Sequence, residues 1–170
     1  MKLPFRPASR LVMVAASMVA LAWPAAITAQ SPAKEGRFDF VACWSGTSNA
    51  MPFSKTHSAY TMEFTGMTRS NIADSPFDNN SFRCIGVGGN LGGSATMTVY
   101  CESVDRDGDK RLAVYHTDAS GKTSRETVAG TGKFEGITST IDVVPLGPFP
   151  VVKPGTFQNC NRQSGTYRMK

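Results

Sequence analysis

A glycine-rich segment in the last third of the chain reads Gly130-Thr131-Gly132-Lys133-Phe134-Glu135-Gly136-Ile137. Three glycines within seven residues would weaken an ordinary strand, because glycine has no side chain to pack and loses the most conformational freedom on folding. They favour a tight corner or a close approach of two backbone segments. We therefore predict a barrel corner here, after which a strand runs from Lys133 to Val144.

On both sides of this corner, apolar and polar residues alternate with the period of half-buried strands. No stretch has a convincing helical period. The expected strands are 38–45, 57–66, 82–85, 95–104, 110–117, 122–129, 133–144 and 164–169. These eight segments predict an all-β fold, an eight-stranded antiparallel barrel of the calycin-like kind, in which closure removes the sheet edges. A two-sheet sandwich built from the same strands is the alternative.

Three connections differ in composition from the strands. Residues 67–81 are polar and rich in turn formers, which predicts a mobile loop. Residues 86–93 hold five glycines, but Leu91 stands where a phosphate-binding G-x-G-x-x-G loop needs its third glycine, so a hairpin loop is expected. Residues 145–154 hold four prolines and should be irregular.

The wording GTGKFEGI resembles a segment that precedes a late strand in the allene oxide cyclase and dirigent barrels. This resemblance implies an allene oxide cyclase-like or dirigent-like barrel that holds a hydrophobic small molecule. In those families the protein mainly shapes an apolar pocket that keeps a reactive intermediate in one conformation. Their acting residues have no counterpart to which they can be carried over, because only the corner matches in wording.

The N-terminus has the order of a secretory signal peptide, with Lys2, Arg6 and Arg10 before an apolar run at 11–22 and small residues up to Ala29. We expect a signal peptide at 1–29, a flexible lead-in at 30–36 and one barrel domain at 37–170, in a periplasmic or secreted protein. The apolar run is shorter than the roughly 20 residues of a spanning helix, so no transmembrane segment should remain after signal removal.

Net charge gives no indication of a nucleic-acid partner. The formal charge of +5 falls to +2 once the three basic residues of the expected signal are removed. The remaining Lys and Arg form no cluster, so a surface that could follow a phosphate backbone is not expected.

The four cysteines all follow the expected signal, and in an oxidising compartment they predict two disulfides. Gly92-Gly93 lies midway between Cys84 and Cys101, so a tight hairpin places these two opposite one another and predicts their bond. Cys43 then pairs with Cys160, because barrel closure brings the first strand beside the last. No pair has the C-x₂₋₄-C spacing of a zinc site, and we expect neither a metal nor a cofactor.

Asp105, Asp107 and Asp109 are spaced like the first ligands of a calcium-binding loop. Lys110, however, occupies the position that needs glycine, and His116 the position of the bidentate Glu. The expected structure is an acidic hairpin turn whose carboxylates accept hydrogen bonds from backbone amides.

The only histidines are His57 and His116, and His116 is the candidate catalytic residue because it shares a strand face with Leu112, which should line the interior. His57 should point outward. Glu63 and Glu102 are expected on the outer wall. The absence of G-x-S-x-G disfavours a hydrolase.

A set of apolar residues on the inward faces could line a cavity or plug one end of the barrel. The candidate ligand-binding residues are Phe38, Phe40, Trp44, Tyr60, Met62, Phe64, Leu112 and Phe134. Eight-stranded barrels enclose room for side chains or for one small ligand.

Three functions follow from these patterns. The first is an exported barrel that binds a hydrophobic or aromatic small molecule. The second is a cyclase, isomerase or lyase that acts on such a molecule by positioning it, so the sequence leaves open whether the protein is an enzyme. The third is an envelope or secreted interaction protein with a solid barrel and binding loops at 51–53 and 145–154. The oligomeric state is also left open.

Overall fold

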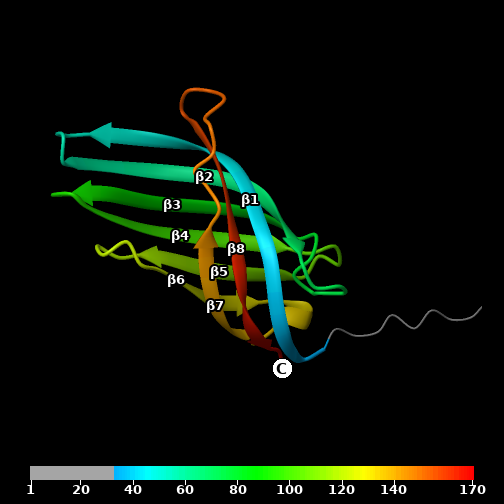
Figure 1. Ribbon diagram of the computed structural model, residues 1–170. Coiled ribbons are helices and arrows are strands. Elements are labelled where there is room, and N and C mark those ends of the chain that lie inside the picture. Colours follow the sequence, from blue (N-terminus) through cyan, green and yellow to red (C-terminus); the bar gives the residue numbers. More distant parts are fainter. Residues whose placement is uncertain (1–32) are drawn as a thin grey trace, which may run out of the picture. The chain divides into compact units, whose positions relative to one another are not determined.

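The computed structural model describes residues 33–170, which form one continuous antiparallel sheet of eight strands (Figure 1). The expected signal peptide at 1–29 lies outside the described residues. The elements are β1 (Glu35–Pro52), β2 (His57–Ser70), β3 (Ser81–Leu91), β4 (Ser94–Val104), β5 (Lys110–Thr117), β6 (Thr123–Gly130), the short 3₁₀ helix η1 (Gly132–Phe134), β7 (Thr138–Pro145) and β8 (Thr156–Arg168).

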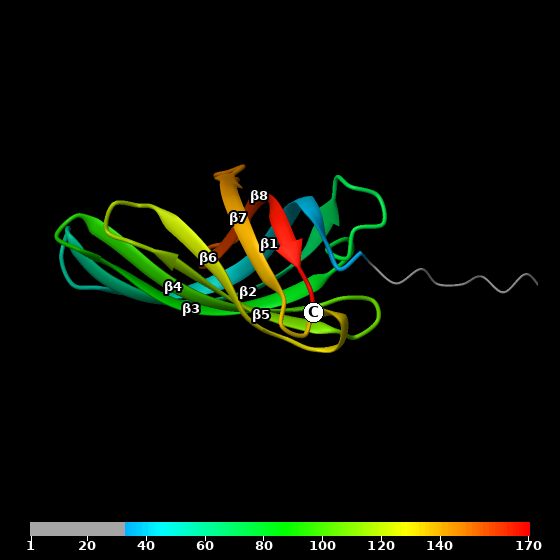
Figure 2. The ribbon, with the colours of Figure 1, turned by 90° about the horizontal axis from the view of Figure 1, so that it is seen from below.

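The strand order is β6-β5-β4-β3-β2-β1-β8-β7, so the first strand pairs with the last as barrel closure requires. The sheet curls until its two edge strands, β6 and β7, approach each other. Within the described residues no backbone ladder joins them, but the Oγ1 atom of Thr127 and the Oγ atom of Ser139 are 3.4 Å apart. Away from this contact β6 and β7 diverge (Figure 2). The predicted eight-stranded antiparallel barrel is confirmed in a nearly closed form, and the two-sheet alternative is wrong.

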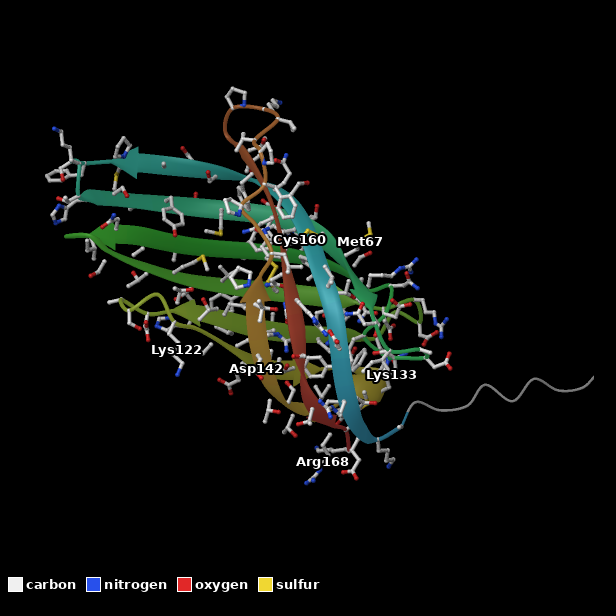
Figure 3. The ribbon with its side chains drawn as sticks, in the orientation of Figure 1. Met67, Lys122, Lys133, Asp142, Cys160 and Arg168 are labelled. Carbon is white, nitrogen blue, oxygen red and sulfur yellow. A yellow bond between two sulfur atoms is a disulfide. The ribbon has the colours of Figure 1, made fainter. Side chains whose placement is uncertain are left out.

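The strand registers place the cysteines as predicted. Cys43 lies opposite Cys160 in the β1–β8 pair, and Cys84 lies opposite Cys101 in the β3–β4 pair. Both pairs form disulfides, with sulfur–sulfur distances of 2.06 Å and 2.01 Å. Cys160 lies where β8 runs beside β1 (Figure 3). The predicted connectivity is therefore confirmed.

One part of the barrel interior is filled by a cluster that we call the plug. Its buried members are Phe38, Phe40, Ala42, Phe77, Phe134, Ile137, Tyr167 and Met169. Strand alternation supplies the members from β1 and β8, and the corner supplies Phe134. The plug packs Phe77 against the rings of Phe38 and Tyr167, with centroid separations of 5.0 Å and 5.1 Å.

Phe77 belongs to the connection between β2 and β3, which was expected to be mobile but is packed into the core. The side chain of Phe77 is 3% exposed and that of Asn80 is 1% exposed. Thr68 Oγ1 donates a 2.6 Å hydrogen bond to the Phe77 carbonyl, and the Thr68 amide donates to the Asn80 carbonyl. Polar turn residues thus hold a single aromatic side chain in place, which composition alone did not indicate.

The glycine corner is present, but the strand after it begins later than expected. Gly132 and Gly136 have φ angles of +52° and +66°, which favour glycine. A Cβ atom on Gly130 would lie 2.0 Å from the Phe134 carbonyl oxygen, so the backbone approaches itself closely. Turn hydrogen bonds make residues 132–134 a 3₁₀ helix, and β7 starts at Thr138 instead of Lys133.

Several further boundaries differ from the predictions. β1 continues to Pro52, so residues 51 and 52 of the expected binding loop at 51–53 belong to a strand, and β2 continues to Ser70, into the connection expected at 67–81. Residues 86–91 belong to β3 and not to a loop. Gly88 has no side chain and so leaves room for Tyr60, because a Cβ atom on Gly88 would lie 2.4 Å from the Tyr60 hydroxyl oxygen. Only Gly92-Gly93 forms the turn. β8 begins at Thr156, well before residue 164, and β1 begins at Glu35, inside the expected lead-in.

Among the described residues, no helix has both the length and the apolar character needed to cross a membrane.

Candidate functional site

The barrel interior next to the plug is hollow. It contains a cavity of about 340 Å³, to which every one of the eight strands contributes lining residues. This volume lies within the range of small-molecule sites, about 300–1,000 Å³. The interior is therefore solid where the plug lies and empty beside it.

Aromatic and sulfur-containing side chains form most of the apolar wall. Trp44 of β1 packs against Phe64 of β2 with ring centroids 5.6 Å apart, and Phe64 packs edge-on against Phe157 of β8 at 5.8 Å. Phe82, Met62 and Met97 extend the same wall, into which the buried Cys84–Cys101 disulfide is also built. Flat apolar walls of this kind favour a flat apolar ligand.

Most of the polar part of the lining comes from β5, β6 and β8. The Gln163 amide nitrogen donates hydrogen bonds to the Tyr115 hydroxyl, at 3.1 Å, and to the Asn161 side-chain oxygen, at 3.0 Å. Tyr115 also faces Arg125, whose guanidinium lies 5.6 Å from the centre of the tyrosine ring. A polar chain therefore crosses the interior from β8 to β5 and on to β6.

Arg111 is the most buried charged group of the lining. The residue is 3% exposed, and its guanidinium packs against the rings of Phe77 and Phe134, 4.5 Å and 4.8 Å from their centres. The pKa of Arg111 is lowered to about 9, first by burial and second by the nearby positive charge of Arg125. At neutral pH the guanidinium is still charged, on the cavity side of the plug.

The cavity opens between the diverging ends of β6 and β7. Thr123 at the start of β6 and Pro145 at the end of β7 belong to its lining and are exposed. The two strands meet at Thr127 and Ser139, farther from this opening. The unpaired seam of the barrel thus provides the mouth of the cavity, as the exposure of these two lining residues indicates.

The predicted ligand-binding residues fall into three groups. Phe40, Trp44, Met62 and Phe64 line the cavity, as expected. Phe38 and Phe134 are buried in the plug, and Tyr60 covers Gly88 outside the cavity lining.

The interior placement of Leu112 is wrong, because this side chain is 38% exposed on the outer wall. The inward face of β5 carries Arg111, Ala113 and Tyr115. The larger aliphatic residues of β5, Leu112 and Val114, occupy the opposite face, so alternation of polarity pointed to the wrong side of this strand. The inward orientation of Arg111 was missed, because the sequence around an arginine in a strand does not indicate that its side chain points inward.

His116 shares the outward face of β5 with Leu112, so its predicted interior position is also wrong. It is exposed, and its Nδ1 atom lies 3.1 Å from the Thr98 hydroxyl on the neighbouring strand. It does not belong to the cavity lining. His57 is exposed, as expected, and contacts the Ser54 and Thr56 hydroxyls.

The mid-strand carboxylates lie on the outer wall, as predicted. Glu63 pairs with Arg83 at 2.8 Å, and Glu102 pairs with Lys110 at 3.2 Å. Each partner in these pairs is more than half exposed, so they contribute little to stability.

The acidic turn between β4 and β5 has the predicted structure and one feature that was missed. Asp105 Oδ1 accepts hydrogen bonds from the amides of Asp107 and Asp109, at 2.9 Å and 3.0 Å. Lys133 of the corner inserts its ammonium between the carboxylates, 2.5 Å from Asp105 Oδ2. The cation that binds to the carboxylates of this turn is therefore the ammonium group of Lys133.

The pKa values of this pair reflect their mutual attraction. Burial acts to raise the pKa of Asp105, but the hydrogen bonds from Lys133 and the two amides outweigh it and lower that pKa. Burial acts to lower the pKa of Lys133, and the two aspartates outweigh it in the other direction. Within residues 33–170 no cluster of His, Cys, Asp or Glu is arranged to hold a metal ion.

Comparisons of the chain with protein-family models, with curated proteins and with solved structures found no match. The resemblance of the corner to the allene oxide cyclase and dirigent barrels therefore stays an expectation.

Proposed function

We propose that this protein is an exported barrel that binds a hydrophobic or aromatic small molecule in its interior and releases it unchanged. The observation that carries the proposal is the cavity of about 340 Å³ behind an open seam, with a wall of aromatic and thioether side chains. Sites of this size with mostly apolar walls and a few polar groups are typical of ligand binding.

The residues of the lining favour binding over catalysis. The lining includes Tyr115 but neither a histidine nor a carboxylate, so no acid–base pair faces a bound molecule. His116 lies on the outer wall. A hollow interior also argues against the third function, a solid barrel that acts through its loops. Two disulfides in the barrel wall are consistent with an oxidising compartment outside the cytoplasm.

A pair of single substitutions tests whether ligands enter this cavity. Val143 lines the cavity near its mouth, whereas its neighbour Val144 is 56% exposed on the other face of β7. Naphthalene methanol and naphthoate, a neutral and an anionic probe with the same rings, should each be titrated by isothermal calorimetry. Val143→Phe should weaken binding by about tenfold or more, and Val144→Phe by less than about twofold, because only the first fills the cavity.

Trp44 provides an independent readout, since it lines the cavity and is the only tryptophan after residue 23. Saturable quenching of its fluorescence should follow the calorimetric isotherm. If neither probe binds the wild-type chain, or if both valine variants bind alike, the proposed function is wrong.

A further inference from the structure

Two arginines face the cavity, and the structure gives neither a counter-charge. Arg111 of β5 and Arg125 of β6 both belong to the lining. Among residues 33–170, the Nε atoms of both are buried and have no hydrogen-bond partner. Neither arginine takes part in an ion pair with a described residue.

Carboxylates of the protein do not supply the missing charge. None of the residues that line the cavity is acidic. Asp105 is the acidic group that acts on Arg111, but its carboxylate is held by Lys133 and by two backbone amides. Buried charges in proteins are ordinarily paired, because an unpaired one is poorly solvated. Two guanidiniums that face one cavity without a partner therefore leave a place for an anion.

The aromatic contacts of the two arginines fix where this anion would lie. The guanidinium of Arg111 packs against two neighbouring plug rings, and that of Arg125 lies over the Tyr115 ring. Stacking of this kind orients the planar guanidinium and leaves its in-plane N–H groups for an acceptor. Carboxylates match this planar donor arrangement and can accept two parallel hydrogen bonds from one arginine.

We propose that the natural ligand is an amphiphilic carboxylate, with its anionic group held by Arg111 and Arg125 and its flat apolar body against the wall of Trp44, Phe64 and Phe82. This inference rests on the proposed function and adds the charge of the ligand to it. It also explains why arginines occupy inward positions of β5 and β6, where a purely hydrophobic interior would have apolar residues.

The two naphthalene probes separate charge from shape, because they differ in one group. The wild-type chain should bind naphthoate at least about tenfold more tightly than naphthalene methanol near neutral pH, since charge-assisted hydrogen bonds are stronger than neutral ones. Acetate, which has the charge without the rings, should bind at least about tenfold more weakly than naphthoate.

Three variants locate the preference. Arg111→Met and Arg125→Gln should each bring the ratio of the two dissociation constants close to one, because each removes a charge that only the anionic probe uses. Arg83→Met changes an exposed arginine of the outer wall and should leave the ratio unchanged. Should Arg111→Met fail to fold, the ratio in wild type and in Arg125→Gln decides the matter by itself.

Equal affinity of the wild-type chain for the two probes overturns the carboxylate and leaves the proposed function intact. A preference that survives both arginine substitutions also overturns it, because the anion would then bind elsewhere. If neither probe binds, the proposed function fails, and this inference fails with it.

Discussion

Replacement of Arg111 by methionine should make the protein more stable while it removes the carboxylate preference. Burial lowers the pKa of Arg111 to about 9, well below that of an arginine in water. At 1.36 kcal/mol per pKa unit, this difference corresponds to roughly 5 kcal/mol of lost solvation for the charged form. Methionine keeps the unbranched stem and its packing and has no charge to desolvate.

The aromatic contacts of Arg111 reduce this gain. Its guanidinium lies 4.5 Å and 4.8 Å from the centres of the Phe77 and Phe134 rings. Each desolvated contact of this kind contributes about 1–2 kcal/mol, and methionine replaces part of it through sulfur–aromatic contacts. We expect the free energy of unfolding of Arg111→Met to exceed that of the wild type by about 1–3 kcal/mol.

The effect should depend on pH in a defined direction. Below about pH 9 Arg111 is protonated in both states, so its full solvation cost is present. Above about pH 9 the unfolded chain binds more protons than the folded one, so the stability of the wild type rises with pH relative to the variant. At about pH 10 the advantage of Arg111→Met should be smaller than at about pH 7, by on the order of 1 kcal/mol.

Urea unfolding without reductant, followed by the fluorescence of Trp44, measures this directly. Arg83→Met is the matched control, because Arg83 is 65% exposed and its pair with Glu63 should be worth less than about 1 kcal/mol. A loss of more than about 1 kcal/mol in Arg111→Met, with Arg83→Met unchanged, would refute the reasoning, since the ring contacts would then outweigh the lost solvation.

Two further predictions concern the corner and the export of the chain. Gly132→Ala should cost about 2–4 kcal/mol of stability, because its φ is +52° and the new Cβ would lie 1.8 Å from Asp109 Oδ1. Gly121→Ala, at φ +82° with open space around the new Cβ, should cost only about 1 kcal/mol by the same thermal melts; equal losses would show that the contact with Asp109 is unimportant. The intact mass of protein collected outside the cytoplasm should match a chain that begins at or near Gln30, whereas a mass that includes residues 1–29 would contradict export with signal cleavage.

Hairpins and disulfides could be predicted because their causes are local. Gly92-Gly93 permits a tight turn, the turn fixes the register of β3 against β4, and the register places Cys84 opposite Cys101. The Cys43–Cys160 pair then followed from closure of the barrel. Each step depends on residues that are near each other in sequence or on the geometry shared by all closed sheets.

The cavity face of β5 could not be predicted, because its cause is not local. Leu112 and Val114 have the polarity of inward residues, and Arg111 has the polarity of an outward one. Arg111 is tolerated inside only because Phe77 of the β2–β3 loop and Phe134 of the corner enclose its guanidinium. Those two residues lie far from Arg111 in sequence, so the pattern of the strand itself contains no trace of them.

A hollow barrel with two inward arginines needs stabilisation from elsewhere in the fold. The Cys43–Cys160 disulfide joins cysteines 117 residues apart, which in the chain-entropy model corresponds to about 5 kcal/mol. This stabilisation is similar in size to the solvation free energy that burial of Arg111 costs. The disulfide links β1 to β8, and both strands contribute side chains to the plug. The covalent cross-link thus stabilises the barrel without filling the cavity. The side of the barrel that opens at the β6–β7 seam can then stay empty and positively charged, as binding of an amphiphilic carboxylate requires.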